Sequence, residues 1–138
     1  MEGRGNSAPG EGVPLPPPTP PDILVWVLDE DEVDLSNSDA LFEPLMHAAY
    51  AAGGRVLLDT TAVTFMDSSG LDYLLRLQQL CRDVGGLLAL VPGPRVDRLI
   101  QKARLERFFA RAPDQDAARA LLSAALEAAD SVPHDLPE

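Results

Sequence analysis

The stretch Asp67-Ser68-Ser69-Gly70-Leu71 lies between a strand-like apolar run and a strongly periodic helical run. This order predicts a strand, a turn and a helix that begins with hydroxyl side chains. The first N–H groups of a helix lack intrahelical partners, and the helix dipole adds partial positive charge there. An anion attached to Ser68 or Ser69 would therefore be stabilised. The commoner interpretation is that Asp67, Ser68 and Ser69 only cap the helix.

The helical pattern after this turn covers residues 71–84. On a helical wheel, apolar side chains fill a broad arc, and polar side chains form one stripe that Ser68 begins: Asp72, Arg76, Gln79 and Asp83. The hydroxyl and this polar stripe therefore point to one side of the molecule, as a switchable partner surface would require. A solvated helix face is the commoner explanation. The only cysteine, Cys81, lies on the apolar arc and is expected to be a buried hydrophobic side chain.

Apolar runs predict buried strands at residues 23–28, 56–59 and 87–91, the first of them covered on both faces. Helical patterns cover residues 40–52, 71–84, the segment around 95–103 and about 113–129. Strands that alternate with helices at short spacing predict an α/β fold. We expect a single domain with a mixed, mostly parallel sheet of about four to five strands and helices packed on it.

Three local expectations accompany this fold. Pro44 removes a backbone donor and should kink the helix at 40–52 or shift its start. Phe108-Phe109 is expected to end a short edge strand. The side chains of the helix around 95–103 that should face inward are Val96, Leu99, Ile100 and Ala103.

The sequence divides into three parts. Residues 1–21 contain most of the proline and are expected to form a disordered or polyproline-II-like tail. Residues 22–129 form the domain, and residues 130–138 are expected to be a flexible C-terminal tail. With 138 residues, of which 46% are apolar, the chain is long enough to bury a core.

The formal net charge of −11 argues against binding to nucleic acid or to an anionic membrane surface. No run approaches the ~20 apolar residues of a membrane span, and no cationic segment followed by an apolar core opens the chain, so we expect a soluble cytoplasmic protein. Six of the eleven basic residues nevertheless lie between positions 95 and 111. A solvated basic face is the default interpretation, and contact with an acidic partner surface is the alternative.

We expect no catalysis by this chain. Ser68 lacks a convincing histidine base, because His47 lies in the helix interrupted by proline and His134 lies near the C-terminus. Asp59 and Asp67 are better explained as a strand-end and an N-cap carboxylate than as a catalytic pair. No Cys/His cluster has metal-ligand spacing, so neither a metal nor a cofactor is expected. A serine hydrolase is the least favoured alternative.

Several motifs together resemble the STAS family, whose name stands for sulphate transporter and anti-sigma factor antagonist. They are Val56-Leu57-Leu58-Asp59, Phe65-Met66-Asp67-Ser68-Ser69-Gly70-Leu71, and Gly85-Gly86 followed by the apolar run at 87–91. The resemblance covers residues 23 to about 128, and Glu32-Val33-Asp34-Leu35 matches the family's acidic motif. It implies a STAS fold and a stand-alone bacterial anti-sigma factor antagonist.

In such members, the serine directly after the motif's aspartate is phosphorylated by a partner anti-sigma factor that is also a serine kinase. The resemblance thus implies phosphorylation at Ser68. Unphosphorylated protein binds the anti-sigma factor and frees the sigma factor, phosphorylated protein lets go, and a serine phosphatase resets the switch. The motif and the polar stripe together give the expected partner-binding residues Asp67, Ser68, Ser69, Gly70, Asp72, Arg76, Gln79, Glu32 and Asp34.

Three positions depart from the family pattern. Asp31 stands where members usually carry a glycine, and Pro44 interrupts a helix that many members have unbroken. Asp72 would repel a phosphate on Ser68 by some tenths of a kcal/mol, partly offset by Arg76. The main alternative is a STAS-type interaction module in another signalling or transport-regulating complex, with Ser68 not phosphorylated.

Overall fold

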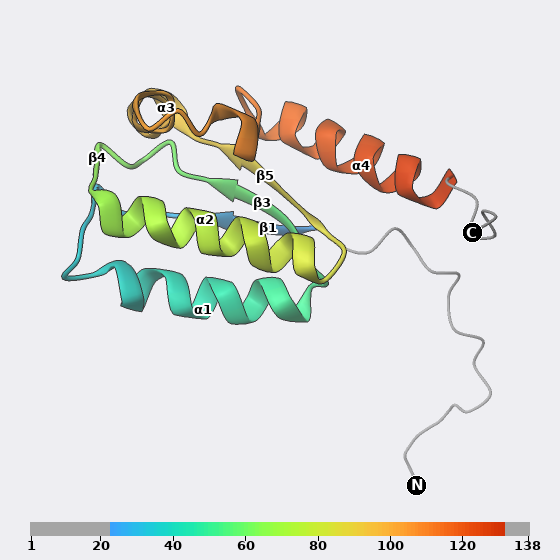
Figure 1. Ribbon diagram of the computed structural model, residues 1–138, viewed down its shortest axis with the longest axis horizontal. Helices are drawn as coiled ribbons and strands as arrows, with labels where there is room; N and C mark the ends of the chain where they lie inside the picture. Colours follow the sequence, from blue (N-terminus) through green and yellow to red (C-terminus); the bar gives the residue numbers. More distant parts are fainter. Residues whose placement is uncertain (1–22, 132–138) are drawn as a thin grey trace, which may run out of the picture.

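The computed structural model describes residues 23–131, so the expectations for residues 1–21 and for 132–138 lie outside the described residues. The elements in chain order are β1 (Leu24–Val27), β2 (Glu32–Val33), α1 (Ser38–Ala51), β3 (Arg55–Asp59), β4 (Phe65–Met66), α2 (Ser68–Asp83), β5 (Leu87–Val91), α3 (Gly93–Lys102), the 3₁₀ turn η1 (Glu106–Phe108), β6 (Ala110–Arg111) and α4 (Gln115–Ser131). Figure 1 shows their arrangement as an α/β fold.

The central sheet contains four strands in the order β1-β3-β5-β6. All its pairs are parallel, with Val25 opposite Leu57 and Leu57 opposite Ala89. Parallel neighbours need crossover connections, which α1, α2 and α3 supply. A second sheet pairs β2 with β4, also in parallel, with Val33 opposite Met66. The predicted α/β class and the mostly parallel sheet are confirmed.

Helices cover both faces of the central sheet (Figure 1). Helices α1 and α2 lie side by side on one face, and α4 packs against β3 and β5 on the other. Alternate residues of β3 and β5 enter two separate cores. On the α1–α2 side these are Val56, Leu58, Leu88 and Leu90, and on the α4 side Leu57, Ala89 and Val91 join Ala118 and Leu122. Burial on both faces explains the uninterrupted apolar runs in the sequence.

Strand β1 is less deeply buried than the sequence pattern suggests. It lies at the edge of the sheet, where its only partner among the described strands is β3. Its first three residues are partly buried, and Val27 is 52% exposed. Its side chains nevertheless pack against both cores, Leu24 and Trp26 on the α1–α2 side and Ile23 and Val25 on the α4 side. The apolar run at 23–28 is therefore covered on both faces as predicted, but only partly, because it lies at the sheet edge.

Helix α1 continues through Pro44, and its start lies at Ser38, two residues before the expected position. The carbonyl of Asp34 accepts N–H groups from Asn37 at 3.1 Å and Ser38 at 2.9 Å, and this turn sets the start. Buried Phe42 and Leu45 lie on either side of the exposed Pro44. Packing on both sides of the proline holds the helix despite the missing backbone donor.

Two expectations near α3 are also corrected. Ala103 is exposed instead of facing inward, because the helix ends at Lys102 and Arg104 then adopts a left-handed φ of 59°. The pair Phe108-Phe109 precedes the edge strand β6 and does not end it. At the C-terminus, α4 extends to Ser131, two residues beyond the expected end at 129.

Candidate functional site

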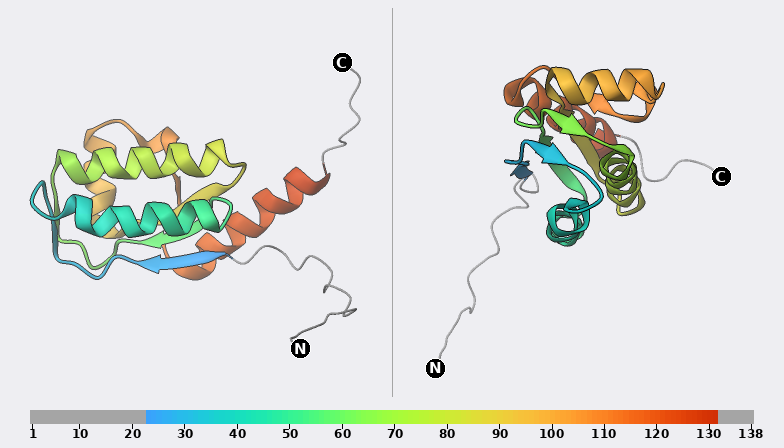
Figure 2. Two further views of the ribbon diagram at one scale, coloured as in Figure 1. Left: turned by 90° about the horizontal axis from the view of Figure 1, so that it is seen from below. Right: turned by 90° about the vertical axis from the view of Figure 1, so that its left-hand side faces the viewer.

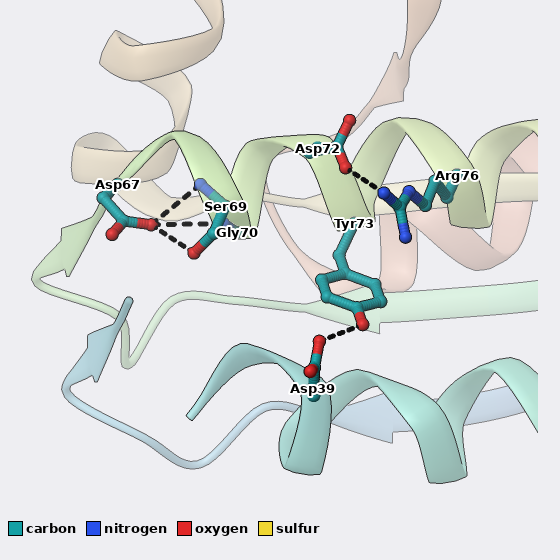
Figure 3. Close-up of polar contacts among 7 residues, drawn as sticks. All are labelled: Asp39, Asp67, Ser69, Gly70, Asp72, Tyr73 and Arg76. Carbon is teal, nitrogen blue, oxygen red and sulfur yellow. Dashed lines mark hydrogen bonds and ion pairs between the residues drawn. The ribbon is translucent and has the colours of Figure 1, made fainter. Parts of the chain in front are cut away.

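The carboxylate of Asp67 caps the N-terminus of α2 (Figure 3). Its Oδ1 accepts a hydrogen bond of 2.9 Å from the Ser69 backbone N–H, one of 2.5 Å from the Ser69 hydroxyl, and a longer one of 3.4 Å from the Gly70 N–H. Asp67 itself has an extended backbone, as expected of an N-cap residue. The common interpretation of the motif as a cap thus holds for Asp67.

The second oxygen of Asp67 joins the helix to a distant turn. Its Oδ2 accepts a 3.2 Å hydrogen bond from the backbone N–H of Leu35. That turn is shaped by Asp34, whose Oδ1 accepts from the N–H and the hydroxyl of Ser36 at 2.9 and 2.6 Å. Strand β2, with Glu32, lies directly before the turn and pairs with β4. The structure therefore brings the acidic segment at 32–35 and the start of α2 into one region.

The two serines of the motif differ in their surroundings. The Ser68 side chain is exposed at the first residue of α2, and its hydroxyl makes no hydrogen bond with any residue from 23 to 131. The Ser69 hydroxyl is half-buried and donates to Asp67. Only Ser68 thus presents a free hydroxyl at the helix N-terminus, where the helix dipole favours an attached anion.

Gly70 is required by close packing. It is buried in the first turn of α2, and a Cβ there would lie 2.6 Å from Met66 Cγ and 2.9 Å from Val33 Cγ1. Such distances are too short for carbon atoms in contact. The missing side chain therefore lets the start of α2 approach the β2–β4 pair, and this approach sets the position of Ser68.

The polar stripe of α2 is exposed as the helical wheel predicts: Ser68, Asp72, Arg76, Gln79 and Asp83 all face solvent. Arg76 forms an ion pair of 2.8 Å with Asp72, and its guanidinium lies 5.1 Å from the centre of the Tyr73 ring. Gln79 donates a 2.7 Å hydrogen bond to Asp83. Asp72 is thus already paired with a cation, which reduces the repulsion it would exert on a phosphate at Ser68.

Tyr73 ties the stripe to α1. Its hydroxyl donates to Asp39 (Figure 3). Its ring stacks on Phe42 with centroids 5.1 Å apart. The bond to Asp39, together with desolvation, raises the pKa of Tyr73. The contact fixes the two helices relative to each other on the exposed side. Sequence reasoning missed this pair, because no local pattern relates residues 34 positions apart.

The charge at the cap follows from its hydrogen bonds. The hydroxyl of Ser69 contributes most to lowering the pKa of Asp67; partial desolvation opposes it, and the backbone N–H groups add to the lowering. Asp67 is therefore ionised at neutral pH. A phosphate on the neighbouring Ser68 would meet this negative charge on one side and the helix N-terminus on the other.

Other polar residues considered in the sequence lie apart from this region. Burial opposes ionisation of Asp59, but hydrogen bonds from Gln115 and Thr61 outweigh it and lower its pKa. Its partners are thus structural, and it shares none of them with Asp67. His47 is exposed on α1 and His134 lies outside the described residues. Within residues 23–131 no three His, Cys, Asp or Glu side chains gather as metal ligands, and no helix has the length and apolarity needed to cross a bilayer.

Two exposed apolar side chains flank the site and were not expected from the sequence. Leu35 is 80% exposed in the turn held by Asp67, and Phe65 is 51% exposed on β4. An apolar residue inside a short strand normally indicates burial, so the sequence pattern gave no signal for Phe65. Both side chains add apolar area to the surface around Ser68, as protein-binding surfaces often do.

Comparison with known proteins is consistent with this geometry. The model of the STAS domain family matches residues 16–120. Among solved structures, the chain is similar to the crystal structure of a candidate anti-sigma factor antagonist from Thermotoga maritima, with a TM-score of 0.58. The two chains are 20% identical, and the match covers 78% of this chain and 90% of the other. No curated protein matches the sequence at a significant level.

Proposed function

The chain belongs to the STAS domain family, and on this premise we propose that it is an anti-sigma factor antagonist that acts by partner switching. In its unphosphorylated form it binds an anti-sigma factor that is also a serine kinase, and so frees a sigma factor. Phosphorylation at Ser68 ends that complex, and a serine phosphatase restores the binding form. This role implies a cytoplasmic location, where transcription takes place.

The free hydroxyl of Ser68 is the observation that carries the proposal. It lies at the first residue of α2, on the same side as the exposed polar stripe, and makes no hydrogen bond within residues 23–131. Ser69, the other candidate in the motif, is engaged with Asp67. A kinase can therefore reach Ser68 without breaking a contact, whereas modification of Ser69 would remove part of the helix cap.

The charges around Ser68 give a physical reason why a phosphate there would weaken binding to the partner. A phosphate adds about 1.5 to 2 negative charges and three acceptor oxygens. It would stand next to the ionised Asp67, on a surface fitted to a partner that accepts a neutral hydroxyl there. Desolvating this new charge in the complex needs to cost only a few kcal/mol, at about 1.4 kcal/mol per tenfold in affinity, to release the partner. No refolding of the domain is needed.

Parallel pull-downs with Ser68→Ala and Ser68→Asp baits test the proposal. We expect a kinase-like anti-sigma factor on the Ala bait and its loss from the Asp bait. Ser123→Asp, the same chemical change at an exposed serine of α4, is the matched control and should retain the partner. Calorimetry on the identified pair then gives both affinities. Equal affinities for the two Ser68 variants would exclude the switch and leave a STAS interaction module that does not use phosphorylation.

We also propose that the chain is a phosphate acceptor and not a catalyst. Within residues 23–131 the only histidine, His47, lies on α1 and makes no hydrogen bond to Ser68. Incubation with a serine-directed fluorophosphonate probe checks this. Labelling that disappears in Ser68→Ala would contradict the proposal and indicate a hydrolase.

A further inference from the structure

Helix α3 and the turn after it carry a basic surface that the proposed switch does not use. This basic surface comprises the exposed side chains of Arg95, Arg98, Lys102, Arg104 and Arg107. None of the five forms an ion pair or side-chain hydrogen bond with any residue from 23 to 131. The acidic Asp97 nearby is already paired with Arg111 at 2.5 Å. In a chain of net charge −11, five unpaired cations within residues 95–107 are an exception.

This arrangement works against the stability of α3. Arg95 and Arg98, and Arg98 and Lys102, are like charges at helical spacings of three and four, each costing a few tenths of a kcal/mol. Arg95 also lies in the first turn, where the helix dipole disfavours a cation and where α3 has no acidic residue. Lys102 gains from the helix dipole because it lies in the last turn, but no acidic side chain of the described residues pairs with Arg95, Arg98 or Lys102. An acidic group from outside the domain would do so.

An apolar cleft adjoins the basic surface. Its volume is about 230 Å³. Its apolar lining is Phe65 and Met66 of β4 and Leu99 of α3, and its polar lining is Thr64, Arg95, Arg98 and Lys102. Phe65 is 51% exposed there. The cleft thus combines a site for one apolar side chain with three cations beside it.

The cleft lies next to the phosphorylation site. Helix α3 packs against β4, and β4 leads directly into Asp67 and Ser68. The right-hand view of Figure 2 shows α3 running alongside β4, with β2 on the other side of that strand. One partner can therefore contact the start of α2 and the α3 cleft at the same time.

We propose that the cleft and the basic surface bind an acidic segment of the partner protein, with one large apolar side chain seated against Phe65 and Leu99. The proposal rests on the proposed function for the identity of the partner, which is the anti-sigma factor. The acidic and apolar character of the bound segment follows from the surface alone. Cations flanking an apolar cleft match carboxylates flanking an apolar anchor, and such complementarity gives both specificity and fast association.

A long polyanion fits this surface poorly. The acidic residues Asp31 and Glu32, which follow Asp29 and Glu30 in the chain, lie next to β4. The carbonyl of Asp31 accepts the N–H groups of Thr64 and Phe65 at 2.7 and 3.2 Å. A nucleic acid or an anionic bilayer that covered the basic surface would also approach this acidic segment and be repelled. A short acidic segment fixed by one apolar anchor avoids it.

The first experiment uses a synthetic peptide and needs no identified partner. A fluorescein-labelled peptide of glutamate and aspartate around one phenylalanine is titrated with the full chain, and anisotropy is measured. We expect binding that weakens with salt and falls about tenfold or more for Arg98→Glu/Lys102→Glu. Arg82→Glu/Arg119→Glu, an equal charge change at exposed sites on α2 and α4, should bind like the unmodified protein. Replacing the peptide's phenylalanine with alanine should also weaken binding.

Two results would overturn the inference: equal binding by the two double variants, or binding of polyuridylate or phosphatidylserine vesicles without binding of the peptide. Circular dichroism and thermal melts show that each variant is folded. The partner from the pull-down is then measured against Arg98→Glu/Lys102→Glu in the Ser68→Ala background, where its affinity should fall while the control keeps it. If the peptide binds as expected but Ser68→Ala and Ser68→Asp bind the partner equally, only the proposed function is refuted. If the Ser68 variants differ as expected but Arg98→Glu/Lys102→Glu does not change partner affinity, only the docking surface is refuted.

Discussion

Gly70→Ala tests the close packing that positions Ser68. The new methyl group would lie 2.6 Å from Met66 Cγ and 2.9 Å from Val33 Cγ1, and Val33 is fully buried on β2. Overpacking of this kind costs about 1–3 kcal/mol, and two such close contacts favour the upper half of that range. Alanine regains about 1 kcal/mol of helix propensity over glycine. We therefore expect a net loss of about 1–2 kcal/mol in the free energy of unfolding.

Urea denaturation followed by the fluorescence of the single tryptophan, Trp26, measures this loss. The midpoint should fall with an unchanged m-value, because the surface exposed on unfolding stays the same. Val33→Ala makes room for the methyl group, so the double variant should be more stable than the sum of the single losses, by about 0.5 kcal/mol or more. A Gly70→Ala protein as stable as the original would refute the packing argument, and with it our explanation of how Ser68 is placed.

Three further outcomes are expected. Cys81 is buried and desolvation raises its pKa to about 11, so a disulfide reagent at pH 8 should label it only after urea is added; rapid labelling of the folded protein would contradict its burial. Asp67→Asn should be less stable than the original protein above the unfolded aspartate pKa of about 3.9. The pKa of Asp67 is lowered by folding, so the stabilisation by its charge is complete above the unfolded pKa and is lost as the pH falls through the folded pKa. Urea midpoints at pH 3 and pH 7 measure the difference, and an equal gap at both would show that the charge is not involved. Arg76→Glu combined with Gln79→Lys should weaken partner binding in calorimetry. The melting temperature should not fall, since exposed ion pairs contribute only about 0–1 kcal/mol to the free energy of unfolding. Unchanged binding would confine the interface to the loops.

The sequence predicted the parts of the fold that depend on local pattern. The apolar runs at 56–59 and 87–91 became β3 and β5, and the wheel of residues 71–84 placed the exposed stripe of α2 correctly. Helices α1 and α2 end at Ala51 and Asp83, each one residue before the predicted end, and Gly53, Gly54 and Gly85 after them adopt positive φ. These features follow from periodicity and backbone freedom, which neighbouring residues alone determine.

The parts that depend on contacts between distant residues were not predicted. Strands β2 and β4 have two residues each, too few for any periodic signal, and they form only because they pair with each other. The bond from Leu35 to Asp67 joins residues 32 positions apart. The start of α1 differed because the Asp34 turn and the core contacts of Phe42 and Leu45 outweigh the effect of Pro44. Tertiary packing decides such cases over local propensity.

The Asp67 cap has a consequence for recognition by any modifying enzyme. Ser68 is presented on a helical backbone whose geometry depends on the turn at Leu35 and on the glycine that allows α2 to approach β4. A short peptide with the same residues would not hold a helix in water, because nucleation of an isolated turn is unfavourable. An enzyme that modifies Ser68 in this geometry must therefore read tertiary shape and not linear sequence. Nascent or misfolded chains would escape modification, so that the phosphate would mark only molecules that have completed folding.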